Sequence, residues 1–213
     1  MGENKSISSS VKKQFDLTGK CAVITGGAGF LGLQFSETIA EMGGKPILLD
    51  FDSELLQSAS NNLNKCGYKN HSQHKIDITD EDKFQELINN IWEINKGIDI
   101  LINSAGLTKS AIESKNHDFF ADFENTNQVL WDQGLKLNLT STQISCKIIG
   151  SKMAANGSGT IINVASDVGA ISPNQNIYKP DDYGYKGVDF NTPAFYAVSK
   201  AGVIHLTKFL ATY

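Results

Sequence analysis

Thr25-Gly26-Gly27-Ala28-Gly29-Phe30-Leu31-Gly32 is the stretch that decides the fold of this chain. Before it, residues 20–24 (KCAVI) have the apolar, β-branched character of a buried strand. After it, residues 33–42 carry apolar side chains at helical spacing and end at Gly43-Gly44. Such a turn accepts a pyrophosphate, because the free N–H groups and the dipole of the following helix attract the anion. A tight strand-to-helix turn also needs glycine for steric reasons alone, so the motif requires support from the rest of the chain.

Composition and length indicate one globular domain. The chain has 213 residues, 40% of them apolar, which is enough for a full hydrophobic core. Its net charge is −4 and all 19 basic residues are lysine, which argues against a nucleic-acid partner. Cys21, Cys66 and Cys146 are widely spaced and suit a reducing compartment, with neither a disulfide framework nor metal-ligand spacing. We therefore expect a cytoplasmic protein with no metal, no nucleic-acid partner and no membrane partner.

Predicted strands alternate with predicted helices. Residues 1–16 are rich in Ser and Lys and predict a flexible arm, so the domain is expected to span 17–213. Thr79 with Asp82 resembles a capping box at the start of the third helix. The alternation predicts an α/β fold of the Rossmann type, a doubly wound parallel sheet with right-handed crossovers. The predicted strands are 20–25, 45–50, 74–77, 98–103 and 159–164, and the predicted helices are 29–42, 53–66, 79–96, 128–155 and 193 to the end, with polar segments at 107–127 and 166–193.

Acidic and amide side chains follow three of the predicted strands. In a sheet of this kind, ligands bind at the carboxyl ends of strands near the point where the strand order reverses. Asp50 ends the second strand, where an acid accepts both ribose hydroxyls of an adenosine and repels a 2′-phosphate, which favours NAD over NADP. Asp77 ends the third strand, and the small residues of 103–106 (NSAG) let a flat nucleoside lie against the backbone after the fourth. Turn formation alone also accounts for Asn and Gly at these positions.

The most specific local signal is Tyr196-Ala-Val-Ser-Lys200, at the start of the last predicted helix. A spacing of four places Tyr196 and Lys200 on one face of that helix. A free tyrosine is a poor base at neutral pH, and a neighbouring ammonium favours its phenolate. Ser166, just past the fifth strand, either hydrogen-bonds a substrate oxygen or forms a turn. Asn138 is a mediocre helix former within the long helix, where it either supports a water chain or faces solvent.

Together these residues resemble the short-chain dehydrogenase/reductase family. The resemblance runs from about residue 17 to the end and rests on several motifs in the same order as in that family. The motifs are TGGAGFLG at 25–32, Asp50, Asp77, NSAG at 103–106, Asn138, Ser166 and YAVSK at 196–200. The resemblance implies an enzyme that passes a hydride directly between a nicotinamide and a substrate carbon, with an alcohol or ketone as the reacting group.

The resemblance also implies a role for each matching residue. Tyr196 is expected to be the general acid/base, with Lys200 favouring its phenolate and holding the nicotinamide ribose. Ser166 is expected to orient the substrate carbonyl or hydroxyl, and Asn138 to hold a water of the proton relay. The residues expected to bind the cofactor, NAD rather than NADP, are Gly26, Gly29, Phe30, Leu31, Gly32, Asp50, Asp77, Ile78, Asn103, Ala105, Gly106, Tyr196 and Lys200.

Two departures from the family pattern concern its branches. The glycine spacing TGxxGxxG resembles the extended, sugar-nucleotide-modifying branch, whereas NSAG and the short chain favour the single-domain branch, which we prefer. The stretch from Ser166 to Tyr196 is longer than that branch usually has, and its polar and aromatic residues suit a polyhydroxylated substrate. It is similar to members that serve bacterial surface-sugar or flagellin-glycan biosynthesis, although a solvated insertion without function is an equal alternative. The additional residues include Tyr178, Lys179, Asp181, Asp182, Tyr183, Tyr185 and Lys186.

The third departure is the end of the chain at Tyr213, where family members continue into further strands and a substrate-covering lobe. The sheet is therefore expected to lack the last strands of the family fold. The principal hypothesis is an NAD-dependent oxidoreductase acting on an alcohol or ketone of a sugar or sugar derivative. Two alternatives stay open. One is a nucleotide-binding homologue without catalysis, and the other is a sugar-nucleotide epimerase or dehydratase.

The resemblance also predicts the partners. The substrate is expected to be a small polar molecule, and the protein a homodimer or homotetramer. In this family the long helix and the helix that carries Tyr196 commonly pair with those of a second copy. The side chains expected to be buried by that copy are Phe195, Val198, Ile204 and Leu206.

Overall fold

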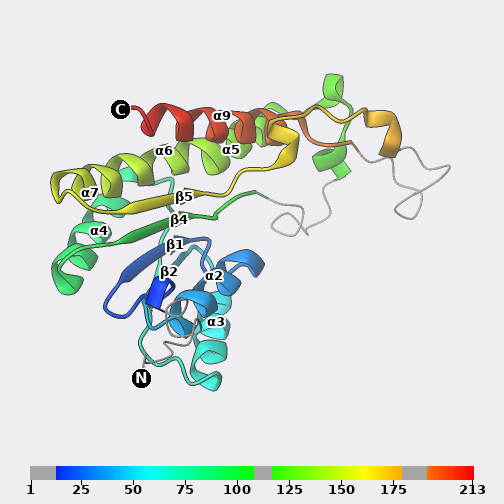
Figure 1. Ribbon diagram of the computed structural model, residues 1–213. Coiled ribbons are helices and arrows are strands. Elements are labelled where there is room, and N and C mark those ends of the chain that lie inside the picture. The colour runs from blue at the N-terminus through cyan, green and yellow to red at the C-terminus, as the bar shows by residue number, and fades with distance from the viewer. Residues whose placement is uncertain (1–12, 108–116, 179–190) are drawn as a thin grey trace, which may run out of the picture.

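The computed structural model describes residues 13–107, 117–178 and 191–213, which form a five-stranded sheet with helices on both faces (Figure 1). The strands lie in the order β3-β2-β1-β4-β5, and every neighbouring pair is parallel. The predicted doubly wound parallel sheet of the Rossmann type is thus confirmed. The strands are β1 (Cys21–Thr25), β2 (Lys45–Asp50), β3 (Ser72–Lys75), β4 (Ile100–Asn103) and β5 (Thr160–Asn163).

The direction of winding reverses at β1. From β1 the chain moves outward through β2 to β3, and β4 then returns to the other side of β1. Thr25 at the end of β1 pairs with Leu49 of β2 and with Asn103 of β4, so the carboxyl ends of these strands meet at one edge of the sheet. Ligands of open α/β sheets bind in the crevice at such a reversal. Asp50 and Asn103 both lie at this edge.

Helices cover both faces of the sheet (Figure 1). On one face lie α2 (Phe30–Glu41) and α3 (Ser53–Lys65), where Leu48 of β2 packs in one cluster with apolar residues of α3. The other face is covered by α4 (Glu81–Asn95) and by a long helical run over residues 128–155. The last helix, α9 (Ala194–Leu210), lies beside that run. Burial of apolar side chains between these layers supplies the main driving force for the fold.

The long helical run has the bounds that the sequence predicts, but it is not a regular α-helix throughout. It consists of α5 (Gln128–Leu135), α6 (Ser141–Ser145) and α7 (Ser151–Ala155), joined by the π-helical segments η4 (Lys136–Thr140) and η5 (Cys146–Gly150). Hydroxyl groups of residues that follow η4 donate to backbone carbonyl oxygens one turn earlier. Thr142 Oγ1, for example, donates to the backbone carbonyl oxygen of Asn138 at 3.1 Å. Such bonds bend or widen a helix, and π segments are frequent at functional sites.

Two local predictions are wrong. The strand expected at 74–77 is β3 at Ser72–Lys75, so Asp77 lies beyond the strand and not at its end. Thr79 does not cap α4, because Asp80 occupies the N-cap position and its carboxylate accepts a backbone N–H of the first turn at 3.2 Å. The Thr79 hydroxyl instead donates to Asp77 Oδ1 at 2.7 Å.

Some predictions concern parts of the chain outside the described residues. Residues 1–12 of the flexible arm expected at 1–16 lie outside them, as does the segment at 179–190, to which most of the additional aromatic and charged residues belong. Tyr178 is described and ends the short 3-10 helix η7 (Gln175–Tyr178). Over the described ranges, the protein contains no helix with the length and apolar character needed to cross a bilayer.

Candidate active site

The glycine turn joins β1 to α2 as the sequence predicts. Gly26 has a φ of +64°, and a Cβ there would lie 2.8 Å from the Ala105 Cα in the turn after β4. A Cβ on Gly32 would overlap the Gly26 carbonyl oxygen. At the N-cap of α2, Gly29 provides no side-chain cap, and the following Phe30 side chain is exposed. The N-terminus of α2 is therefore uncapped by side chains, as an anion site at a helix terminus requires.

Asp50 lies at the end of β2 against this turn. One carboxylate oxygen accepts the Ala28 N–H at 3.2 Å, and the other accepts the Asp52 N–H at 3.3 Å. The residue is 8% exposed. Two backbone groups thus hold the carboxylate beside the turn, where it can accept ribose hydroxyls. The chain contains no arginine, so it lacks the side chain best suited to a 2′-phosphate. Leu31, also predicted to bind the cofactor, is exposed on the first turn of α2.

Asp77 and Ile78 lie in the connection between β3 and α4. The Asp77 carboxylate is exposed, and its Oδ1 accepts both the Thr79 N–H at 2.9 Å and the Thr79 hydroxyl. The Ile78 side chain is 6% exposed and belongs to the hydrophobic core. Any cofactor contact from Ile78 is therefore expected from its backbone.

The side chain of Asn103 is directed into the interior. Its Oδ1 accepts the Ser145 hydroxyl at 2.6 Å, and its Nδ2 donates to Asn163 Oδ1 at 2.8 Å. The residue is 4% exposed. The amide therefore holds β4 against β5 and the long helical run, a structural role that the sequence prediction did not include. The N–H groups that follow, at Ser104 and Ala105, both donate to Thr25 Oγ1 at 3.2 and 3.3 Å.

Tyr196 and Lys200 lie one turn apart in α9. The Lys200 Nζ is 5.8 Å from the centre of the Tyr196 ring and donates to the Val164 carbonyl oxygen at 2.7 Å. Lys200 is 6% exposed, and this burial lowers its pKa from the ordinary value. A Cβ on Gly106 would lie 3.9 Å from the Lys200 Nζ, so the turn after β4 reaches the lysine. No local sequence pattern indicates that Val164 supplies the acceptor.

Ser166 lies just beyond β5, in a segment that packs on α9. Its hydroxyl donates to Asp167 Oδ1 at 3.0 Å. The short 3-10 helix η6 (Asp167–Gly169) follows, and a Cβ on Gly169 would lie 2.6 Å from the Lys200 carbonyl carbon. The structure thus brings the segment that carries Ser166 against the helix that carries Tyr196 and Lys200. Asp167, the partner of Ser166, was not singled out in the sequence.

Asn138, the fourth predicted catalytic residue, is enclosed by protein groups. It lies in η4 and is 0% exposed, so the alternative that it faces solvent is wrong. Its Oδ1 accepts the Leu107 N–H at 2.6 Å, and its Nδ2 donates to Ser199 Oγ at 3.1 Å. Asn138 therefore links the turn after β4 to α9. The expectation that it holds a water of the proton relay stays a prediction.

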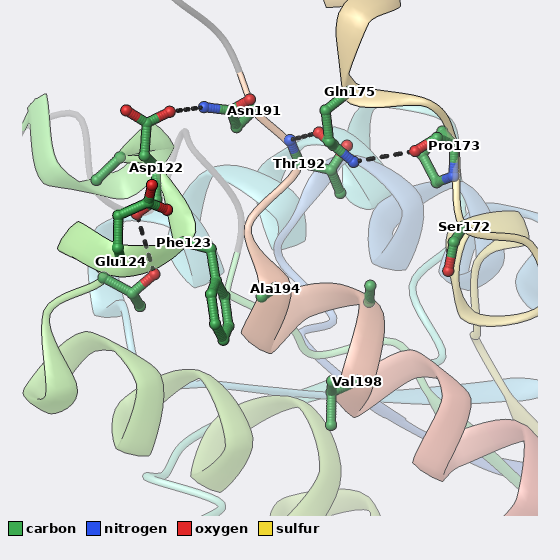
Figure 2. A pocket seen from close by; sticks show the side chains of 13 residues that line it. Asp122, Phe123, Glu124, Ser172, Pro173, Gln175, Asn191, Thr192, Ala194 and Val198 are labelled. Carbon is green, nitrogen blue, oxygen red and sulfur yellow. Dashed lines mark hydrogen bonds between the residues drawn. The ribbon is translucent and has the colours of Figure 1, made fainter.

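A cavity of about 360 Å³ lies beside the N-terminal part of α9 (Figure 2). Ala194, Ala197 and Val198 of α9 contribute to its wall. In Figure 2, Asn191 points toward Asp122 and Gln175 toward Thr192, and these contacts are hydrogen bonds of 2.9 Å each. The four predicted catalytic residues are not among the residues that line this cavity, although Ala194 and Ala197 lie on either side of Tyr196 in the sequence of α9.

Comparison with known proteins identifies the family. The model of the short chain dehydrogenase family matches residues 20–179, and the chain belongs to this family. It is 28% identical to an NAD-dependent glycerol dehydrogenase of Listeria innocua. The alignment spans 199 residues and covers 93% of this chain and 66% of that protein. It is 27% identical to a D-threitol dehydrogenase of Mycolicibacterium smegmatis, covering 95% of this chain and 67% of that one. The chain thus spans about two thirds of the length of the curated relatives it matches.

Other relatives and solved structures agree with this assignment. A 3-oxoacyl-acyl-carrier-protein reductase of Rickettsia bellii is 31% identical, covering 92% of this chain and 67% of its own length. The structure of an NAD+-bound xylitol dehydrogenase matches with a TM-score of 0.73 at 24% identity, over 92% of this chain and 67% of that chain. The structure of levodione reductase matches with a TM-score of 0.76 at 23% identity, over 92% and 66%. These two structures share the fold.

Proposed function

We propose that the protein is an oxidoreductase that transfers a hydride between a nicotinamide cofactor, preferably NAD, and an alcohol or ketone. One observation carries the proposal. The buried Lys200 Nζ is held by the Val164 carbonyl oxygen beside the ring of Tyr196, and the turn after β4 reaches the same amine at Gly106. This arrangement supports the proposed roles of Tyr196 as general acid/base and of Lys200 as cation, next to the edge of the sheet at which such folds bind a dinucleotide.

The residues at that edge fit a dinucleotide. The uncapped N-terminus of α2 would hold the pyrophosphate, Asp50 the hydroxyls of the adenosine ribose, and Lys200 the nicotinamide ribose. The bound nicotinamide supplies the acceptor or donor of the hydride. The side chains of this protein would hold the cofactor and the substrate in the reactive geometry and transfer the proton.

Tyr196 carries the proton in this proposal. In the direction of reduction its hydroxyl gives a proton to the substrate oxygen, and in the direction of oxidation its phenolate takes one. The Lys200 ammonium favours the phenolate, and its hydrogen bond to the Val164 oxygen fixes where the positive charge lies. The Ser166 hydroxyl hydrogen-bonds the substrate oxygen, which orients the reacting carbon.

As substrate we propose a small polyol, a sugar or a sugar derivative. Two of the relatives named above are a glycerol dehydrogenase and a D-threitol dehydrogenase, which favours hydroxylated substrates of small size. The long segment between Ser166 and Tyr196 adds tyrosine, lysine and aspartate residues that suit several hydroxyl groups.

We also propose that the protein acts in the cytoplasm as a homodimer or homotetramer. Val198 of α9 is 49% exposed and Val129 of α5 is 62% exposed, and these two helices pack against each other. A second copy would remove this apolar surface from water. Phe195 does not belong to that surface, because it is 1% exposed within its own chain, and its predicted burial by a partner is wrong.

The test is turnover of polyols with NAD+, and of the matching carbonyl compounds with NADH, by wild type and two variants. Tyr196→Phe keeps the ring and removes the proton donor, so we expect turnover to fall by about a hundred- to ten-thousand-fold. NAD binding, measured by calorimetry, should persist. Tyr213→Phe is the control, since Tyr213 is 96% exposed at the end of the chain. Unchanged turnover in Tyr196→Phe would overturn the assignment, and cofactor binding without turnover in wild type would favour the non-catalytic alternative.

A further inference from the structure

A buried hydroxyl connects the predicted catalytic tyrosine to the rest of the molecule. Ser199 is 0% exposed, and its Oγ donates to the Tyr196 carbonyl oxygen at 2.8 Å. The same oxygen accepts a hydrogen bond from Asn138 Nδ2 at 3.1 Å. Asn138 in turn accepts the Leu107 N–H at 2.6 Å. One line of hydrogen bonds therefore joins the turn after β4, the π segment η4 and the first two turns of α9.

The direction of every bond in this line is determined by the groups present. The Leu107 N–H can only donate, so the Asn138 oxygen faces it and the Asn138 nitrogen faces Ser199. Ser199 Oγ must then accept, and its single proton is left for the Tyr196 carbonyl oxygen. If the Asn138 amide were rotated by 180°, its NH2 group would face the Leu107 N–H, so that two donors would meet without an acceptor. In the protein interior such an unsatisfied polar group is costly. The arrangement is thus the one that satisfies all of these groups.

The start of α9 needs such an anchor. The helix begins at Ala194 without a side-chain cap, and Tyr196 lies in its first turn, where helices fray. Lys200 has its own attachment through the carbonyl oxygen of Val164, the residue directly after β5. The bonds of Ser199 attach the carbonyl of Tyr196 to the second turn of α9 and, through Asn138, to η4.

We propose that Ser199 is a positioning residue that holds Tyr196 at the crevice through Asn138. The hydroxyl acts on the backbone of Tyr196 and not on substrate or cofactor. The effect on turnover rests on the proposed function, whereas the effect on the position of Tyr196 does not. The two parts can therefore be measured separately.

The position of Tyr196 is measured by ¹⁹F NMR of protein labelled with 3-fluorotyrosine. The chain has 6 tyrosines, and the resonance that disappears in Tyr196→Phe identifies the one of interest. We expect Ser199→Ala to shift or broaden this resonance. Ser141→Ala is the matched control, because Ser141 is 2% exposed and its hydroxyl likewise donates to a carbonyl of its own helix, at Leu137. Ser141→Ala should leave the Tyr196 resonance in place.

A second variant tests the same link from its other end. Asn138→Ala should move the Tyr196 resonance in the same way, and the double variant with Ser199→Ala should move it no further, because both changes break one connection. Ser199→Ala should also lower kcat by about ten- to a hundredfold, the range expected when the Tyr196 hydroxyl is displaced by about 1 Å. The KM for NAD should stay within about twofold of the wild-type value, because Ser199 does not contact the cofactor in this proposal.

Each outcome separates the position of Tyr196 from the function of the protein. A folded Ser199→Ala with an unchanged Tyr196 resonance overturns the proposal, as does an equal shift in Ser141→Ala. A shift confined to Ser199→Ala and Asn138→Ala supports it even where wild type shows no turnover, and in that case the proposed function alone fails. A shift together with the expected loss of kcat supports both.

Discussion

The ring of Phe195 occupies the space that a Cβ on Gly134 would need. Phe195 is 1% exposed and also meets Phe119 edge to face, with ring centroids 5.5 Å apart. Gly134 lies in α5 and Phe195 directly precedes Tyr196 in α9. The missing side chain at residue 134 therefore sets how closely the two helices approach beside the predicted catalytic tyrosine.

Gly134→Ala should destabilise the protein. Overpacking against a buried ring costs roughly 1–3 kcal/mol, while the higher helix propensity of alanine contributes about 1 kcal/mol in the other direction. We therefore expect the free energy of unfolding to fall by about 1 kcal/mol in urea denaturation. Gly150→Ala is the control, because a Cβ there meets first the terminal Cδ1 of Ile161, at 3.2 Å. A Gly134→Ala protein more stable than wild type would contradict this packing.

Asp50→Ala should reduce the preference for NAD over NADP. The carboxylate repels a 2′-phosphate, so wild type should bind NAD more tightly, and the ratio of the two dissociation constants should narrow by about tenfold in the variant. Because Asp50 also accepts the Ala28 N–H, affinity for NAD itself should fall, and the ratio is the informative quantity. Asp52→Ala removes the cap of α3 two residues later and should leave the ratio unchanged. Calorimetry that finds NADP bound as tightly as NAD by wild type would reject the assignment.

The stability difference between Lys200→Met and wild type should depend on pH. Burial lowers the pKa of Lys200 below 10.5, so the unfolded chain binds this proton more tightly than the folded one. At pH values below the pKa of Lys200 in the folded protein, the buried ammonium lowers the free energy of unfolding. As the pH rises from that pKa toward 10.5, the folded protein loses this proton first and the free energy of unfolding of wild type increases. We expect the free energy of unfolding of wild type to rise relative to Lys200→Met over this window. Lys208→Met, which removes an exposed lysine from the same helix, controls for net charge. A constant difference across the window would refute the prediction.

Val198→Glu should weaken self-association. Val198 lies on the exposed apolar surface proposed to meet a second copy, and a buried unpaired carboxylate there would oppose assembly. Sedimentation velocity at about tens of micromolar, a range where weak dimers persist, should show wild type as a dimer or tetramer and Val198→Glu shifted toward monomer. Ile94→Glu, at a 76% exposed position of α4, should leave assembly unchanged. A folded wild-type monomer at this concentration would count against the proposal.

The elements that the sequence predicts well have local signals. Apolar runs and glycine breaks mark β1, β2 and α2, and the long helical run has its expected bounds at 128–155. The third strand was misplaced because Ser72–Lys75 has no apolar character of its own. Its position follows from pairing with β2, where Lys75 lies opposite Asp50. Strand formation of this kind depends on tertiary context, which the local pattern does not contain.

The residues of the candidate site likewise fall into those that a local sequence pattern reveals and those that depend on distant contacts. Tyr196 and Lys200 are recognisable because their spacing in a helix fixes their common face. The acceptor for Lys200 is 36 residues away at Val164, and the partner of Asn138 is 61 residues away at Ser199. Contacts over such separations follow from how the layers pack. The inward orientation of Asn103 has the same origin, since its partners lie on β5 and on the long helical run.

The π segment η4 keeps two halves of one helix in phase. Buried positions recur every four residues at Leu130, Gly134, Asn138 and Thr142. A regular α-helix turns about 100° per residue, so each such step would rotate the buried side by about 40°. The wider turn at Lys136–Thr140 takes up part of this rotation. Deleting one residue there would turn the halves against each other by roughly 100°, so that contact with Phe195 or contact with the sheet is lost. The length of this segment, in addition to the hydrogen bonds of Asn138, therefore determines how the two halves of the helix face their partners.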